Sequence, residues 1–193
     1  MKKLKFKIIY SNYIMMSKVW EYKSNENDKL AEKVEKDNTI VMTKSDMAKH
    51  LISQISFIDG DKVMEPCKGD GAFYDNLPNN VEKLWCEINE GKDYMEFNGK
   101  VDITLSNPPF VPSKLFWSFM QKSMETTDRE IYWLVNMSSL NVFTPKRLQE
   151  MKEKNWFIQS FYVVSDKRWY GRYIWIKIAR KNLNTFTWNE KSF

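Results

Sequence analysis

Cysteine and histidine are scarce in this sequence, which has two cysteines and one histidine among its 193 residues. Structural zinc sites need about four such ligands at short spacings, so we expect no metal site. The cysteines, Cys67 and Cys86, fall at the ends of predicted strands. We therefore expect small buried thiols in a reducing cytosol rather than a disulfide.

Long apolar runs are also missing, since no stretch reaches the roughly 20 residues that cross a bilayer. The chain starts with basic and then apolar residues, but Ser11 and Asn12 interrupt the apolar part and no small-residue cleavage site follows. We expect a cytoplasmic protein without a signal peptide or a membrane partner. The composition, 42% hydrophobic, suits a charged N-terminal segment, residues 1–40, followed by one folded domain, residues 41–193.

The net charge of +5 and the sequence pI near 9.0 give a mild preference for polyanions. A basic, aromatic segment lies between two strand-like runs, 156–165 and 173–179, and is predicted to be a hairpin tip. Such residues suit phosphate contacts and base stacking. The alternative is an ordinary charged hairpin whose aromatic rings pack on its own strands. The candidate nucleic-acid-binding residues are Lys167, Arg168, Trp169, Tyr170 and Arg172.

Local signals predict an α/β domain. Thr43 and Thr144 are helix-capping types before helical stretches, and Pro145 suits a first helical turn. The predicted strands are 62–66, 83–88, 101–106, 131–136, 157–164 and 173–179, and the predicted helices are 14–36, 44–55, 113–125 and 145–154. Their order favours a mostly parallel sheet with one antiparallel strand. A ligand crevice is then expected at the carboxyl ends of the strands.

The most informative motif is Asn107-Pro108-Pro109-Phe110, directly after the apolar stretch 101–106. Two prolines fix φ and remove two backbone donors, and a residue before proline is extended, so Asn107 is held stiffly at the strand end. Its amide offers a donor and an acceptor, Pro108 adds a carbonyl, and Phe110 adds a flat apolar face. This set suits a planar group with an exocyclic amine, such as a nucleobase. The alternative is a loop that only ends a strand.

A second motif lies upstream, where the segment 63–73 is predicted to be a strand that enters a glycine-bearing turn. Gly69 and Gly71 allow positive φ and close approach of the backbone to a ligand. Further acids follow in order: Glu87 ends the next predicted strand, and Asp93 comes after a short gap. The order of these features before Asn-Pro-Pro-Phe is more specific than any of them alone.

That order resembles the S-adenosylmethionine-dependent amino-group methyltransferases, in particular the adenine-specific DNA methyltransferases, over residues 43–180. The resemblance implies a Rossmann-like methyltransferase fold, with a mostly parallel seven-stranded-type sheet and a C-terminal antiparallel hairpin. It implies that the glycine loop holds the cofactor's methionine part, that Glu87 binds the ribose, and that Asp93-Tyr94 lies by the adenine ring. The implied cofactor-binding residues are Thr43, Glu65, Pro66, Cys67, Gly69, Gly71, Phe73, Glu87, Asp93 and Tyr94.

The resemblance also implies the reaction, which is methyl transfer from S-adenosylmethionine to the exocyclic amino group of adenine in DNA. Asn107 and the Pro108 carbonyl would hold the amine, and Phe110 would stack on the flipped base. The implied catalytic residues are Asn107, Pro108, Pro109 and Phe110. In related enzymes the corresponding hairpin lies near the flipped base, which favours a nucleic-acid role for residues 167–172, with Trp169 or Tyr170 as second walls.

Two features depart from the family. The part between the glycine loop and Asn107 is compressed, with Pro78 soon after Phe73 and five residues between Glu87 and Asp93, so the usual helix has no room. Nothing resembles a target recognition domain, although reading a duplex usually needs an element that reaches base edges. We expect low specificity, or a homodimer or partner subunit that supplies recognition.

Three other functions remain open from the sequence. An RNA adenine methyltransferase would use the same site. A protein glutamine methyltransferase also uses Asn-Pro-Pro-Tyr, although the basic, aromatic hairpin argues mildly against it. A catalytically silent subunit that binds nucleic acid is favoured by the compressed cofactor half and opposed by the intact Asn-Pro-Pro-Phe.

Overall fold

A computed structural model describes residues 42–110, 112–166, 172–181 and 187–192 of the chain. The N-terminal segment 1–40, with its predicted helix at 14–36, lies outside the described residues, and so do Lys167, Arg168, Trp169 and Tyr170. The division of the chain near residue 41 therefore stays a prediction. Among the helices of the described residues, none has the length and apolar character needed to cross a membrane.

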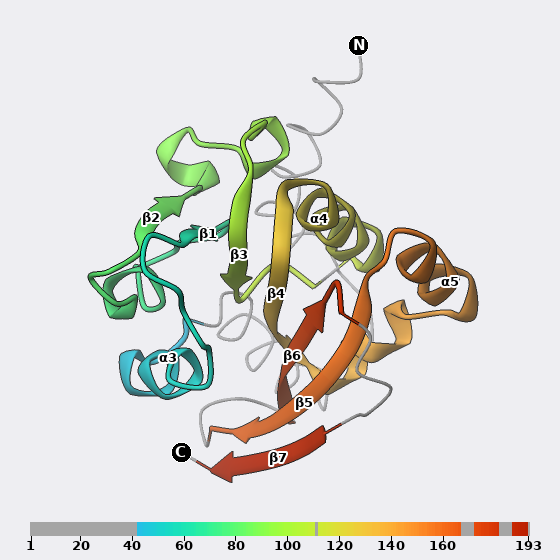
Figure 1. Ribbon diagram of the computed structural model, residues 1–193. Coiled ribbons are helices and arrows are strands. Elements are labelled where there is room, and N and C mark those ends of the chain that lie inside the picture. Colours follow the sequence, from blue (N-terminus) through green and yellow to red (C-terminus); the bar gives the residue numbers. More distant parts are fainter. Residues whose placement is uncertain (1–41, 111, 167–171, 182–186, 193) are drawn as a thin grey trace, which may run out of the picture. The chain divides into compact units, whose positions relative to one another are not determined.

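The described residues form a seven-stranded sheet with the order β2-β1-β3-β4-β6-β5-β7 (Figure 1). The strands are β1 Lys62–Glu65, β2 Glu82–Trp85, β3 Val101–Ser106, β4 Thr127–Asn136, β5 Phe157–Ser165, β6 Tyr173–Ala179 and β7 Thr187–Ser192. Strands β2, β1, β3 and β4 are parallel, and β6 lies antiparallel between β4 and β5. The mostly parallel sheet with an antiparallel C-terminal strand is confirmed. The edge strand β7, which pairs parallel with β5, is not among the predicted strands.

The helices α3 Ser45–Ile52, α4 Ser113–Thr126 and α5 Pro145–Glu153 pack on the sheet. Side chains of a strand alternate between its faces, and in β4 Ile131, Trp133 and Val135 join a core cluster with residues of α4 and α5. Burying each such large apolar side chain stabilises the fold by roughly 1.5–3 kcal/mol. On the other face, the Trp175 ring stacks on Tyr132 with 5.6 Å between centroids. The two apolar faces explain why helices flank the sheet.

The half of the domain between β1 and β3 is compact, as the sequence predicted. Its connections contain the short 3-10 helices η1 Tyr74–Asn76, η2 Ile88–Glu90 and η3 Tyr94–Glu96 in place of full helices. Leu77 ends η1 with an extended backbone, φ −62° and ψ 143°, because the next residue is Pro78 and a residue before proline avoids the helical region.

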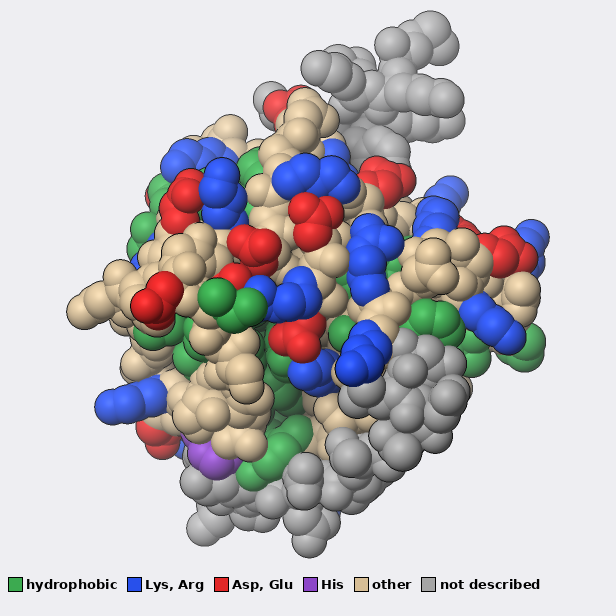
Figure 2. Space-filling view, in the orientation of Figure 1, with side chains coloured by type: hydrophobic (Ala, Val, Ile, Leu, Met, Phe, Trp, Pro, Cys, Tyr) green, Lys and Arg blue, Asp and Glu red, His purple; other side chains and the backbone are tan. Residues whose placement is uncertain are grey.

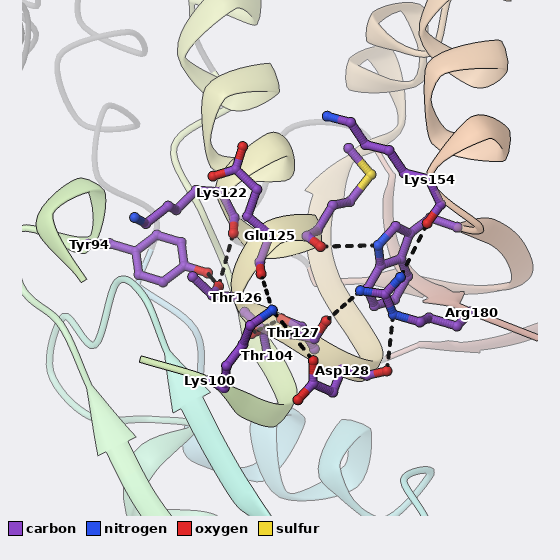
Figure 3. A network of polar contacts seen from close by, with 12 residues as sticks. Tyr94, Lys100, Thr104, Lys122, Glu125, Thr126, Thr127, Asp128, Lys154 and Arg180 are labelled. Atoms are coloured by element: carbon purple, nitrogen blue, oxygen red, sulfur yellow. Dashed lines mark hydrogen bonds and ion pairs between the residues drawn. The ribbon is translucent and has the colours of Figure 1, made fainter. Parts of the chain in front are cut away.

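Arg180, which follows β6, links several chain segments at the end of the sheet where β4 begins (Figure 3). Its guanidinium donates to the carbonyls of Thr127, Asp128 and Lys154 at 3.2–3.3 Å. It also lies over the Trp156 ring, 4.6 Å from the centroid. Arginine serves well here because one planar group makes several hydrogen bonds and a stacking contact at once. This network lies where β4 begins, at the opposite edge from the end of β3 and Asn107.

Candidate functional site

Three of the predicted site residues lie at or just after the carboxyl ends of neighbouring parallel strands. From β1 the chain continues to β2 on one side, while β3 lies on the other side. Such a reversal of strand order leaves a crevice at the carboxyl ends of the two central strands. Glu65 ends β1, Glu87 follows β2 and Asn107 follows β3, and β3 points toward the region of α3 in Figure 1.

The glycine loop has the backbone shape that its sequence predicted. Gly69 and Gly71 have φ of +54° and +88°, values that side chains with a Cβ rarely adopt. The Gly69 N–H donates to Glu87 Oε2 at 2.9 Å, and the Asn89 N–H donates to Glu87 Oε1 at 3.1 Å. A Cβ on Gly71 would lie 3.0 Å from the Asp75 carboxylate. Glu87 therefore holds the loop in shape.

Glu65 is the most unusual group in the site. Its carboxyl is 1% exposed, and within the described residues Oε2 has no hydrogen-bond partner. Burial raises its pKa to about 9, and the nearby charges of Asp70 and Asp75 contribute in the same direction, while the Tyr74 backbone N–H and Lys68 oppose them. The acid is therefore neutral at pH 7, and a positively charged ligand group would relieve this cost.

A pocket of about 140 Å³ opens beside the glycine loop. Its lining residues are Thr43, Ser45, Asp70, Ala72, Asp75 and Asn76. Two carboxylates with hydroxyl and amide groups suit a ligand end that carries an ammonium group. Pockets that enclose a whole small ligand measure roughly 300–1,000 Å³, so this pocket is large enough for part of a ligand only.

Two of the predicted cofactor residues carry buried rings. Phe73, 2% exposed, stacks on Trp175 with 5.3 Å between centroids. Tyr94, also 2% exposed, shares a hydrogen bond with the hydroxyl of Ser123 on α4 at 3.1 Å. It shares a second with the hydroxyl of Thr126 on the same helix at 3.0 Å (Figure 3). Burial raises the pKa of Tyr94 to about 12. Both rings are part of the core, and their predicted contact with a cofactor stays a prediction.

Two other predicted cofactor residues, Asp93 and Cys67, have local structural contacts. Asp93 caps η3 by accepting from the Met95 N–H at 2.9 Å. Ser106 Oγ donates to the Cys67 carbonyl at 3.4 Å, which links the loop after Pro66 to the end of β3. Within the described residues Cys67 and Cys86 are not joined by a disulfide, and burial raises the pKa of the Cys86 thiol to about 11.

The Asn-Pro-Pro-Phe motif leaves β3 with Pro108 buried and the other members half-buried. Asn107 Nδ2 donates to Thr43 Oγ1 at 3.3 Å, across 64 positions of sequence. The Phe110 ring meets Tyr173 edge-on, with 6.2 Å between centroids. The sequence pointed to Thr43 only as a cofactor residue. Nothing in it indicates the contact with Asn107 or the role of Tyr173.

Of the candidate nucleic-acid residues, Arg172 is described. It is exposed, and its carbonyl accepts from the Met137 N–H at 2.9 Å, directly after β4. The base of the hairpin therefore stands beside the strand that neighbours β3. Basic and acidic side chains are interspersed over the face drawn in Figure 2. The net positive charge is thus not gathered on that face.

The strand order, the central crevice and the glycine loop define a Rossmann-like methyltransferase fold, and comparisons with known proteins agree. No model of a known protein family matches the sequence, and no curated protein matches it. A candidate class I S-adenosylmethionine-dependent methyltransferase from Listeria monocytogenes superposes with a TM-score of 0.58 at 11% identity, over 77% of this chain and 64% of that one.

Two further structures share the fold. A modification subunit of a candidate type I restriction enzyme from Vibrio vulnificus YJ016 has a TM-score of 0.55 at 12% identity, over 88% of this chain and 53% of that one. Magnesium protoporphyrin IX methyltransferase from Synechocystis PCC 6803, with S-adenosylmethionine bound, has a TM-score of 0.51 at 8% identity, over 83% of this chain and 86% of that one. The chain thus spans less than two thirds of the Listeria and Vibrio proteins. At these identities the likeness shows the fold, and function must come from the site.

Proposed function

We propose that this chain transfers a methyl group from S-adenosylmethionine to the exocyclic amino group of adenine in DNA. The observation that carries the proposal is the position of Asn107-Pro108-Pro109-Phe110. The motif leaves the carboxyl end of β3, next to the glycine loop that follows β1. An amide, a fixed carbonyl and an aromatic ring thus lie where this fold has its crevice.

The residues at the crevice fit the cofactor. The small pocket, with Asp70 and Asp75 in its lining, and the buried acid Glu65 suit the ammonium group of the cofactor's methionine end. Glu87 suits the ribose hydroxyls, because a carboxylate has about four lone-pair sites and the two N–H groups leave capacity for more. Asp93 would lie by the adenine ring. When bound, the cofactor supplies a methyl group activated by a sulfonium leaving group.

The chain's own contribution is mainly to position the amine. The lone pair of the adenine amine is delocalised into the ring, which makes it a poor nucleophile. Hydrogen bonds from the amine to the Asn107 side chain and the Pro108 carbonyl favour a tetrahedral nitrogen with a directed lone pair. Phe110, whose ring contacts Tyr173 edge-on, would stack on the flipped base. Such orientation is a large part of what an enzyme supplies when the leaving group is already activated.

Target recognition is proposed to come from a second copy or a partner subunit. Between Phe110 and β4 the described residues hold little besides α4, and β4 begins directly after that helix. The Vibrio structure is a modification subunit of a candidate type I restriction enzyme, which supports DNA as the target and a multisubunit assembly. The basic hairpin that ends at Arg172 would add contacts to phosphates and unpaired bases.

A catalytically silent subunit is the second candidate, and the size of the pocket favours it. About 140 Å³ takes only part of S-adenosylmethionine, so the rest of the cofactor would lie outside this pocket. The same site on RNA or on a protein glutamine would use the same amine chemistry.

One experiment separates these functions. The purified chain is incubated with methyl-labelled S-adenosylmethionine and separate pools of DNA, RNA and protein. We expect label in the DNA pool. Label in the RNA or protein pool would mean that RNA or protein, and not DNA, is the substrate. No label in any pool, with cofactor binding intact, would favour the silent subunit.

A further inference from the structure

The segment that precedes and begins α3 holds three parts of the site together. Thr43 Oγ1 accepts from Asn107 Nδ2 at 3.3 Å. Lys44 Nζ pairs with Asp166 Oδ2 at 3.0 Å. Ser45 Oγ accepts from Asn76 Nδ2 at 2.8 Å. Three consecutive residues thus contact the Asn-Pro-Pro-Phe motif, the residue after β5, and η1, which follows the glycine loop.

The Lys44 contact is a strong anchor. The Asp166 side chain is 0% exposed, whereas that of Lys44 is 35% exposed. A buried carboxylate without its charged partner destabilises the folded protein, so breaking this ion pair costs free energy. Asp166 is the last described residue before the basic hairpin, which places the anchor at the base of that hairpin.

The rest of α3 strengthens the same arrangement. Lys44 has an extended backbone and its carbonyl accepts the Ala48 N–H at 2.9 Å, which starts the helix. Farther along, His50 Nε2 and Tyr162 Oη of β5 lie 3.0 Å apart. The residue before α3 is thus tied to the residue after β5, and the last turn of α3 contacts β5 itself. The Thr43 hydroxyl, in a residue 8% exposed, therefore has little freedom to move.

The contact with Thr43 decides how the Asn107 amide is turned. An asparagine amide has a donor end and an acceptor end. Donation from Nδ2 to the Thr43 hydroxyl sets the donor end toward Thr43 and turns Oδ1 the other way. An amine that presents N–H groups needs an acceptor, so this orientation is the productive one for amine binding.

We propose that Thr43 is a positioning residue that orients the Asn107 amide, and that Lys44 and Ser45 hold Thr43 in place for this purpose. The proposal deepens the proposed function and rests on it for the identity of the substrate amine. It differs from the cofactor role that the sequence suggested for Thr43. A positioning role predicts that replacing Thr43 lowers the rate of transfer more than the cofactor affinity, whereas a cofactor role alone predicts equal losses.

The test compares Thr43→Val, which removes the hydroxyl at similar volume, with Thr43→Ser, which keeps it. We expect Thr43→Val to lower kcat by about tenfold to a hundredfold, as for small misplacements of reacting groups. Because Thr43 also lines the pocket, the dissociation constant of S-adenosylmethionine should rise too, but by a much smaller factor than kcat falls. Thr43→Ser should restore most of kcat. Lys44→Met should lower kcat in the same direction, and Lys49→Met, an exposed lysine on the same helix, should not.

A second readout needs no activity. The side-chain amide resonance of Asn107 is assigned in the full chain by its absence from the Asn107→Ala spectrum. Thr43→Val should shift it and speed its exchange with water, and Thr43→Ser should reverse both changes. An unchanged resonance, or a loss of cofactor affinity equal to the loss of rate, would overturn the positioning role. A wild type that methylates nothing while the resonance still responds would refute the proposed function and leave the positioning role supported.

Discussion

The carboxylate of Glu87 accepts a hydrogen bond from the backbone N–H of Gly69, with 2.9 Å between Oε2 and N. The bond joins the residue after β2 to the turn after β1. An acid expected to bind a ribose therefore also holds the glycine loop in shape. Loss of this side chain should affect the cofactor site in two ways at once.

Glu87→Ala should weaken S-adenosylmethionine binding. A lost hydrogen bond to a charged acceptor costs roughly 1.5–3 kcal/mol, or about tenfold to more than a hundredfold in the dissociation constant. Glu87→Gln keeps one acceptor and should lose less. Calorimetric titration measures both, with Glu82→Ala, an exposed acid at the start of β2, as the control. If Glu87→Ala binds S-adenosylmethionine as tightly as wild type, Glu87 does not bind the ribose.

Tyr94→Phe separates a core role from a cofactor role. Removing the hydroxyl breaks its contacts with Ser123 and Thr126. These two hydroxyls still donate to the carbonyls of Phe119 and Lys122, so the loss of unfolding free energy should be moderate, roughly 0.5–1.5 kcal/mol. Denaturant unfolding measures it. Cofactor affinity should stay near wild type, and a clear loss of affinity without a loss of stability would assign the hydroxyl to the ligand.

Glu65 should make stability depend on pH. Folding raises its pKa from 4.5 to about 9, so the folded protein keeps a proton that the unfolded chain loses. Its contribution to stability is complete below about pH 4.5 and declines as pH rises toward 9. Glu65→Gln stays neutral, so it should match wild type near pH 4.5 and exceed it by on the order of 3 kcal/mol at pH 7. Denaturant unfolding at the two pH values measures the difference. A variant less stable than wild type at pH 7 would contradict a neutral Glu65.

Arg172 should contribute to DNA binding through a phosphate contact. Each lost phosphate contact lowers the slope of log K against log salt by about 0.7–0.9. We expect this change for Arg172→Ala and larger changes when Lys167 and Arg168 are also replaced. Lys62→Ala, at the amino end of β1, serves as the matched control. A salt titration in which Arg172→Ala and Lys62→Ala behave alike would place the DNA surface away from the hairpin.

The sequence predicted those elements whose ends carry strong local signals. The strand 101–106 was located correctly because its apolar residues stop at Asn-Pro-Pro, where the backbone has few choices. The strand predicted to begin at residue 131 begins four residues earlier, at Thr127, because the charged residues Asp128, Arg129 and Glu130 are not typical of a buried strand. Arg129 fits there because it donates to Asp61 Oδ1 at 2.8 Å, a partner that the local sequence does not reveal.

The remaining differences come from long-range pairing. The segment Thr187–Ser192 has a weakly apolar sequence, and it is a strand because it pairs with the edge of β5. Strand formation of this kind depends on tertiary context more than on intrinsic propensity. In the site, the glycine turn and the motif after β3 were predictable as local chemistry. The contact between Thr43 and Asn107 spans 64 positions and became visible only with the fold.

The most direct test of the account is analysis of the nucleosides of DNA that has been incubated with S-adenosylmethionine and either wild type or Asn107→Ala. Asn79→Ala, an exposed asparagine ahead of β2, is the control, and the binding of the cofactor to each protein is measured in parallel. We predict N6-methyladenine from wild type and Asn79→Ala, and none from Asn107→Ala, which should still bind the cofactor with near wild-type affinity. N6-methyladenine formed by Asn107→Ala at most of the wild-type rate would contradict the account.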